Sequence, residues 1–335
     1  TSFGELDIQV PRDRDASFEP EIIPKRSRDV SSIEGKVLSM YAKGMSQRDI
    51  ASTIEEIFGF TISHDMVSDI TDQILPELEE WQIRPLAKCY AFLFVDCMYV
   101  TLRENYEVKE CAVYTILGYD LKGNKEILGL WLNQTESKNR WMQIFDEIKE
   151  RGVEDILFIS MDGVSGLENG AKAIFPGVVV QRCLVHLVRN ALRYVPSKSY
   201  KEVCKDMKSF YSASSLKAAQ TAFDTFQTKW AVYPGAIDVW KRNFHHVEQL
   251  FDYGSAIRKI MYTTNAVESV HSSFRKVTKK GAFPNENALL KLLYLRVKEL
   301  QSKWEGGHVH NWAMVLNQLT VNDSFSKRVE KYNRY

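Results

Sequence analysis

Acidic residues stand at two places where the surrounding sequence is strongly apolar. Asp96 interrupts the run YAFLFVDCMYV, and Asp162 ends the run DILFISMDG. A carboxylate within such a run is costly to bury unless it is paired or binds a cation. Two bare carboxylates in contact also repel each other, and a divalent cation relieves that repulsion. Because oxygen-only ligands favour Mg²⁺ or Mn²⁺ over zinc, the pattern predicts a divalent-metal site.

A third carboxylate, Glu268, lies early in TTNAVESVHSSFRKVTKK, which we expect to form a helix capped at Thr264 or Asn265. Two metal ions about 4 Å apart can activate an attacking oxygen and stabilise the leaving oxygen of a phosphodiester. Water as the nucleophile gives strand cleavage, and a DNA 3′-OH gives strand transfer. Each acid alone has a plainer explanation, as a strand end, a turn or a favourable charge at a helix N-terminus. Only the three together favour this chemistry.

The elements that must position these acids predict a mixed α/β core. Three closely spaced strands are expected to form an antiparallel meander. A helix, a strand, a helix and a fifth strand follow, which is the ribonuclease-H-like order, with the first and fourth strands as neighbours. We therefore expect a mixed five-stranded sheet that brings Asp96 and Asp162 side by side. The strands are expected at 90–100, 109–120, 126–134, 155–163 and 178–186, and the helices at 137–151 and 166–175.

Helices are expected on both sides of this core. Ser46 and Ser63 are suitable N-caps and Gly59 a suitable stop, so the N-terminal part reads as a helix-turn-helix-like unit. Asp65, Asp69 and Asp72 on its third helix would repel phosphates, so a structural or dimerising unit stays open. We expect a basic extended arm at 1–30, a helix-turn-helix-like DNA-binding or dimerisation domain at 31–85, the first part of the core at 88–187, an all-helical insertion at 188–260, closing helices with Glu268 at 261–304 and a C-terminal tail at 305–335.

Composition limits the possible classes of protein. The formal net charge is +1, which argues weakly against DNA binding, although cations also cluster locally. Five cysteines without a CxxC argue against a disulfide framework. No apolar stretch approaches the roughly 20 residues that a membrane span needs. The chain starts without Met or a signal-peptide pattern, so we expect a truncated fragment.

Several segments together resemble the bacterial Mutator-like insertion-sequence transposases, over roughly residues 5–300. They are FVDCMYV, MDGVSGL, QRCLVH, TTNAVES and FRKVTKKGAFPNE, with FEPEIIPKRSRD and LSMYAKGMSQRDI upstream. The resemblance implies a DDE transposase whose acids are Asp96, Asp162 and Glu268, on a ribonuclease-H-like fold interrupted by a helical insertion. Family members usually carry an additional N-terminal segment. Cys97 stands where the family has Ala, which places a thiol beside the metals.

The same resemblance implies cofactors and partners. Two Mg²⁺ or Mn²⁺ ions would be bound per active site. The protein would act as a homodimer on double-stranded DNA, both the terminal inverted repeats of a mobile element and the target. Transposition can pass through a circular intermediate. The location would be the bacterial cytoplasm, in association with the nucleoid, without a membrane.

Cys183 and His186 form a C-x2-H pattern on the expected fifth strand. A zinc site would need two more ligands, and none has suitable spacing. The family shares the pair, so His186 could orient a scissile phosphate or an acid. A satisfied, partly buried histidine is the alternative.

Cations that flank the acids are the predicted DNA contacts. Arg275 lies seven residues, about two turns, beyond Glu268 and so returns to its helix face, which Lys279 continues. Trp230 and Trp240 could stack on a flipped or frayed base, although a core position is the commoner fate of tryptophan. The N-terminal cations could equally belong to a solvated arm. The full set of predicted contacts is Arg182, Arg189, Arg193, Trp240, Arg275, Lys276, Lys279 and Lys280, with Arg12, Arg14, Lys25, Arg26 and Arg28 in the arm.

The expected function is therefore DNA transposition by metal-dependent strand cleavage and strand transfer. A structure-selective DNA nuclease would use the same acids and is the nearer alternative. A domesticated, non-catalytic DNA-binding regulator is the other, and the presence of all three acids counts against it. We also expect the helical insertion to leave and re-enter the core at neighbouring points, and to contact DNA or close over the active site.

Overall fold

The computed structural model describes residues 31–59, 61–104, 106–262, 265–279 and 281–333. The arm at 1–30, with its five predicted DNA-contacting cations, lies outside the described residues, as do Lys280 and the possible cap Thr264. Within the described part of the chain, no helix is long and apolar enough to cross a membrane.

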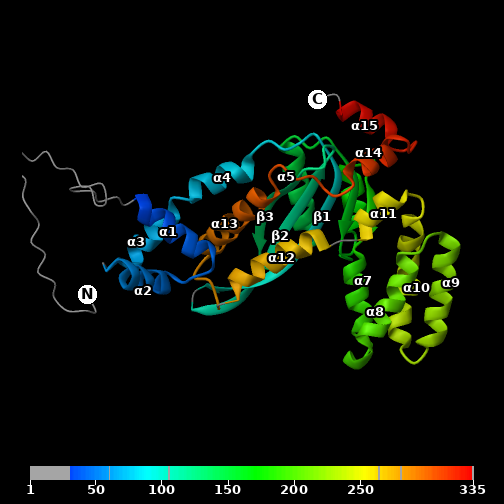
Figure 1. Ribbon diagram of the computed structural model, residues 1–335, viewed down its shortest axis with the longest axis horizontal. Helices are drawn as coiled ribbons and strands as arrows, with labels where there is room; N and C mark the ends of the chain where they lie inside the picture. Colours follow the sequence, from blue (N-terminus) through cyan, green and yellow to red (C-terminus); the bar gives the residue numbers. More distant parts are fainter. Residues whose placement is uncertain (1–30, 60, 105, 263–264, 280, 334–335) are drawn as a thin grey trace, which may run out of the picture.

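One mixed sheet of five strands forms the centre of the molecule (Figure 1). Its strand order is β3-β2-β1-β4-β5. The first three strands form an antiparallel meander, whereas β4 pairs with β1 and with β5 in parallel. The expected five-stranded mixed sheet and the expected neighbours are thus observed. The strands are β1 (Cys89–Glu104), β2 (Glu107–Asp120), β3 (Lys125–Asn133), β4 (Asp155–Met161) and β5 (Val179–Arg182).

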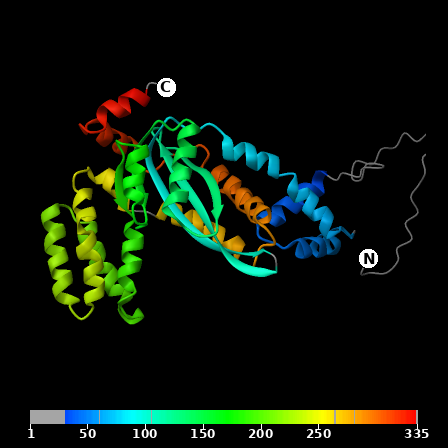
Figure 2. The same cartoon turned by 180° about the vertical axis from the view of Figure 1, so that it is seen from behind.

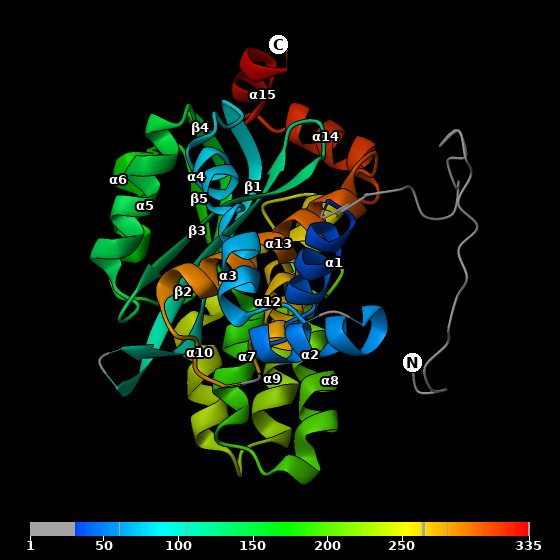
Figure 3. The same cartoon turned by 90° about the vertical axis from the view of Figure 1, so that its left-hand side faces the viewer.

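Apolar side chains fill the strands because helices cover both faces of the sheet (Figure 3). On one face lie α5 (Lys138–Glu150) and α6 (Leu167–Ile174). Ser137 caps α5, and Trp141 and Phe145 lie on its buried face. On the other face lie α12 (Asn265–Thr278) and α13 (Glu286–Trp304), which contact β1 and β3 respectively. The helix that carries Glu268 therefore rests on the strand that carries Asp96.

The N-terminal helices begin and end where the caps predict. Ser46 accepts the Asp49 N–H in a capping box, Ser63 accepts the Met66 N–H, and Gly59 ends its helix in the left-handed conformation. The expected third helix is wrong in one respect, because it divides in two where Pro76 starts a new helix. The four helices are α1 (Ser31–Ala42), α2 (Gln47–Phe58), α3 (His64–Asp72) and α4 (Leu75–Ile83).

Asp72 on α3 forms an ion pair with a buried lysine. The ammonium of Lys291 on α13, itself 4% exposed, lies 2.5 Å from its carboxylate and 3.0 Å from the Thr71 hydroxyl. This ion pair and the Tyr41 hydroxyl, which donates to the Ala288 carbonyl, join the N-terminal helices to α13. One of the three acids that weighed against phosphate binding is thereby neutralised.

The helices that directly follow β5 form a bundle beside the sheet (Figures 1 and 2). The expected strand over 178–186 is wrong at its end: β5 stops at Arg182, Cys183 is the N-cap residue of α7, and His186 lies in the first turn of that helix. The helical part thus begins before residue 188. It comprises α7 (Leu184–Leu192), the 3₁₀ turn Ser197–Ser199, α8 (Tyr200–Tyr211), α9 (Leu216–Lys229), α10 (Pro234–Leu250) and α11 (Ser255–Tyr262).

The C-terminal segment is an ordered part of the core. It forms α14 (Trp312–Thr320) and α15 (Ser326–Tyr332). The Trp312 ring lies against Gly123, where an added Cβ would come within 2.5 Å of the ring. The Arg328 guanidinium donates two hydrogen bonds to Asp155, at the start of β4. The expected C-terminal tail is therefore wrong. The contacts that hold this segment join residues far apart in the chain, and a local sequence pattern does not contain them.

Candidate active site

Asp96 is the buried centre of the site. It lies on β1 with 7% of its surface exposed, and its Oδ1 accepts the Cys97 backbone N–H at 2.9 Å. Parallel pairing between β1 and β4 reaches Phe94 opposite Ser160, two residues before each acid. Asp162 therefore follows the end of β4, level with Asp96 on the neighbouring strand β1. Its Oδ1 accepts the Gly163 N–H at 2.6 Å.

Histidines from two helices contact the Asp96 carboxylate. His271 Nδ1, on α12, lies 3.0 Å from Oδ2, and its side chain is fully buried. His186 Nε2, on α7, lies 3.7 Å from Oδ1. Burial alone would raise the pKa of Asp96, but His271 and then His186 outweigh it and hold the pKa below its ordinary value. The first acid is thus kept ionised inside the protein.

Glu268 lies one turn before His271 on α12, so the same helix brings it to the site. Its carboxylate forms an ion pair with Arg189 of α7. Arg189, predicted from sequence as a DNA contact, therefore holds the third acid. The Glu268 side chain is 18% exposed and that of Arg189 is 50% exposed, so the pair lies at the mouth of the site.

Glu136 is a fourth acid of the site, which the sequence analysis missed. Its Oε1 accepts the Trp141 indole N–H at 2.8 Å. Burial first, then the neighbouring charges of Asp162 and Asp96, raise the pKa of Glu136. The strand directions contained a signal for it. Two antiparallel pairings connect β3 to β1 through β2, and β1 pairs with β4 in parallel, so β3, β1 and β4 all run in the same direction. An acid just after β3 therefore falls at the same end of the strands as Asp162.

His271 was also missed. Its signal was the spacing Glu268-x-x-His271, which places both side chains on one helix face. Nothing in the local pattern indicated that this face would meet Asp96, because the two segments are far apart in the chain.

Cys183 and His186 lie beside the acids, at the N-terminal end of α7. Cys183 is 7% exposed. Contact with Cys183, followed by the charges of Asp162 and Asp96, raises the pKa of His186 to about 9 against the opposing effect of burial. Among the described residues, no three His, Cys, Asp or Glu side chains are grouped as ligands of one metal ion.

The predicted cations occupy different places. Arg182 lies beside Asp162, since a Cβ on Gly163 would meet its guanidinium at 2.3 Å. Arg193 is exposed at the C-terminal end of α7. Arg275 and Lys276 are exposed on α12. The helix ends at Thr278, so Lys279 lies just after it rather than on its face.

The structure corrects the expectation that Trp240 stacks on DNA. Its ring is completely buried in the helical bundle, 4.8 Å from the ring of Phe210, and its indole N–H faces the Met207 sulfur at 3.0 Å. Trp230 is 8% exposed and donates to Asp206. Neither ring can meet a base without opening the bundle, so both are core residues.

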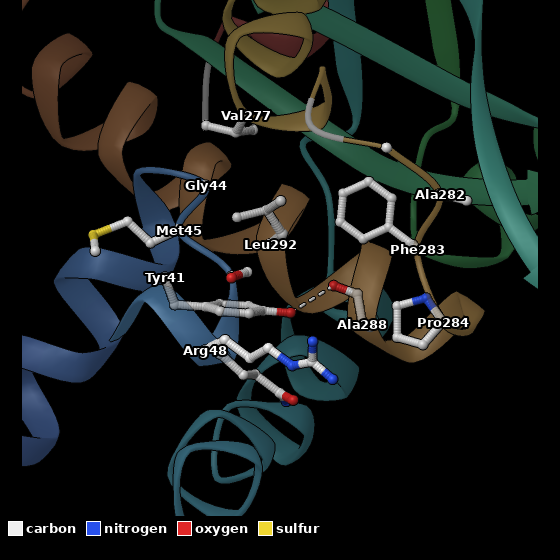
Figure 4. A pocket seen from close by; sticks show the side chains of 13 residues that line it. Tyr41, Gly44, Met45, Arg48, Val277, Ala282, Phe283, Pro284, Ala288 and Leu292 are labelled. Carbon is white, nitrogen blue, oxygen red and sulfur yellow. Dashed lines mark hydrogen bonds between the residues drawn. The ribbon is translucent and has the colours of Figure 1, made fainter. Parts of the chain in front are cut away.

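A cavity of about 290 Å³ lies at the far end of α12, between the α1–α2 turn and the loop 281–285 (Figure 4). Tyr41, Arg48 and Phe283 are among its lining residues. Phe283 also exchanges backbone hydrogen bonds with Thr101 and Arg103 of β1. The loop thus ties the end of α12 to β1, which reinforces the position of the helix that carries Glu268.

Comparison with known proteins identifies the family of this chain. The family model described as "Transposase, Mutator family" matches residues 1–307. A probable transposase for an ISRM3-like insertion sequence element from Sinorhizobium fredii is 38% identical over 324 residues, covering 96% of this chain and 81% of the relative. The transposase for insertion sequence element ISRM3 from Rhizobium meliloti is 37% identical with the same coverage.

A probable insertion-sequence transposase from Corynebacterium diphtheriae is 32% identical over 333 residues, covering 93% of this chain and 97% of the relative. The resemblance expected from the sequence is confirmed: this chain belongs to the Mutator family of transposases.

Proposed function

We propose that this transposase is a DDE enzyme that binds the terminal inverted repeats of its element as a homodimer and catalyses metal-dependent strand cleavage and strand transfer. Asp96, Asp162 and Glu268 would be its catalytic acids, on a ribonuclease-H-like core. The observation that carries the proposal is Asp96, a carboxylate 7% exposed at the centre of a sheet, with two further acids brought to it by β4 and α12. Stability alone gives no reason to bury a charge there.

The side chains fit divalent cations in donor type and charge. Carboxylate oxygens are the ligands that Mg²⁺ and Mn²⁺ prefer. Asp96, Asp162 and Glu136 lie close enough for the charges of the first two to raise the pKa of the third. Such mutual repulsion is what bound cations relieve. Since Glu268 is paired with Arg189, its use as a ligand requires Arg189 to release it.

When bound, the ions would activate the attacking oxygen and stabilise the leaving oxygen of the phosphodiester. The protein's own side chains would orient the reactants. His271 and His186 fix the Asp96 carboxylate, and Arg182 presents its guanidinium next to Asp162. Arg189 could exchange Glu268 for a DNA phosphate, which a guanidinium binds through two parallel hydrogen bonds. Exposed Arg275 and Lys276 would continue the phosphate path along α12.

The test replaces each acid by its amide, as Asp96→Asn, Asp162→Asn and Glu268→Gln. Each change removes a ligand charge while preserving volume. We expect cleavage to fall at least about a hundredfold with DNA binding largely intact, since metal catalysis supplies several kcal/mol. The substrates are labelled duplexes that carry the element ends, with Mg²⁺, and cleavage and joining are scored separately. Substantial Mg²⁺-dependent cleavage by any one variant would remove that residue from the site.

The same assay separates the alternatives. Cleavage without joining, on branched or frayed DNA irrespective of end sequence, would favour a structure-selective nuclease. Binding without either reaction would favour a regulatory protein.

A further inference from the structure

We infer that His271 is a positioning residue: it fixes the Asp96 carboxylate and thereby sets the first acid in register with Glu268. The inference rests on the proposed function, because it concerns how the proposed ligands are held. The observation that supports the inference is the 3.0 Å contact between His271 Nδ1 and Asp96 Oδ2, in which the imidazole is fully buried and the Asp96 side chain is 8% exposed.

The contact connects two acids that are distant in sequence. Glu268 and His271 are three residues apart on α12, so their side chains lie on the same helix face, one turn apart. The contact of His271 with Asp96 therefore fixes α12 against β1 at the level of the first acid. A rotation or slide of α12 that displaced Glu268 would also break this contact.

Stability does not account for a histidine at this position. Val267, Val270 and Phe274 already pack α12 into the core. Among the described residues, His271 Nε2 has no hydrogen-bond partner, and the Nδ1 contact has ion-pair distance without strict hydrogen-bond alignment. An unpartnered buried polar atom is destabilising, and an apolar side chain of similar size would avoid that cost. The imidazole is thus explained by what it does to Asp96.

His271 lies closer to Oδ2 of Asp96 than His186 lies to Oδ1. His186 Nε2 is 3.7 Å from Oδ1, and its side chain is 20% exposed. Groups that hold a ligating carboxylate typically contribute 10–100-fold to metal affinity or activity, because they fix its orientation. Loss of His271 should therefore weaken metal binding without removing a ligand.

Three substitutions separate positioning from packing. In His271→Asn the amide nitrogen occupies the place of Nδ1 and keeps a donor toward Asp96. In His271→Gln the amide nitrogen occupies the place of Nε2 and points away from it. His271→Leu fills the space without any donor. His246, 5% exposed on α10, offers matched controls as His246→Asn and His246→Gln.

Two quantities are measured on the full chain. One is the Mn²⁺ concentration at half-saturation, from the EPR signal of free Mn²⁺ in the absence of DNA. The other is the single-turnover rate of element-end cleavage as a function of Mn²⁺. We expect the Gln and Leu variants to need 10–100-fold more Mn²⁺, the Asn variant to stay within about threefold of the wild type, and the controls to be unchanged.

Equal Mn²⁺ midpoints in all His271 variants, with only thermal stability altered, would overturn the inference and leave His271 as a packing residue. An Asn variant as impaired as the Gln variant would overturn it too, since the Nδ1 contact would then be irrelevant. Should the Leu variant fail to fold, the Asn–Gln pair still decides. Asp96→Asn is measured in parallel. If this variant retains Mn²⁺ binding and cleavage, the proposed function is wrong. If this variant loses both while the His271 variants are unaffected, only the present inference is wrong.

Discussion

His186 and His246 belong to neighbouring helices, α7 and α10, yet their surroundings shift the pKa values of the two imidazoles in opposite directions. Contact with Cys183 and the charges of Asp162 and Asp96 raise the pKa of His186 to about 9. Burial, followed by the charge of His245, lowers the pKa of His246 to about 4. One imidazole faces an excess of negative charge, whereas the other is enclosed without a counter-charge strong enough to keep it protonated.

The difference separates a region arranged for ligands from a region arranged for stability. Around Asp96 the polar groups are buried with incomplete partners and strong mutual repulsion. Inside the helical bundle, the polar atoms of Trp240 and Trp230 meet partners, and the surrounding rings pack face to edge or in stacks. Changes near Asp96 should therefore reduce chemistry more than stability, and changes in the bundle should do the reverse.

The largest expected effect on folding is that of Trp240→Ala. Removing a completely buried ring should lower the free energy of unfolding by about 3–5 kcal/mol, through lost transfer energy and the cavity left behind. Urea unfolding measures it, and Trp240→Phe, which keeps most of the packing, is the control. If Trp240→Phe leaves stability near wild type but weakens DNA binding, the bundle interior has a DNA-contacting role and the comparison fails.

Acidification should destabilise the bundle through His246. Its folded pKa of about 4 lies below the ordinary value of 6.5, so the unfolded state binds the proton first. The stabilisation is complete above pH 6.5 and is lost as the pH falls toward 4, by up to about 3 kcal/mol. Unfolding free energies of the wild type and His246→Gln, measured from pH 7.5 to 4.5, give this contribution as their difference. A constant difference across that range would contradict it.

The smallest effect concerns the exposed cations that follow Glu268. If Arg275 and Lys279 contact phosphates, the double change to Ala should weaken binding to all DNA sequences and flatten the dependence of affinity on salt by roughly two units of slope. Lys122→Ala with Lys327→Ala, exposed cations away from the acids, is the matched control. If thermal stability alone falls, these cations merely balance the helix C-terminus, and the DNA path along α12 is wrong.

Local patterns were sufficient for most elements. Apolar runs predicted the strands that carry Asp96 and end before Asp162, and the caps Ser46 and Ser63 predicted helix starts, because capping and strand burial depend on residues close in sequence. They failed at α7, where QRCLVH reads as apolar strand but the chain turns at Cys183. A short apolar run does not distinguish strand from helix.

The amino-acid sequence by itself determined which acids exist, which elements carry them, and that β1 and β4 were candidates for neighbours. Only the tertiary structure decided that His271 contacts Asp96, that Arg189 holds Glu268, that Glu136 shares the acids' surroundings and that Trp240 is buried. The reason is physical. Capping and periodicity act over a few residues, whereas these contacts join segments far apart in the chain, and their burial and charge depend on how whole helices pack on the sheet.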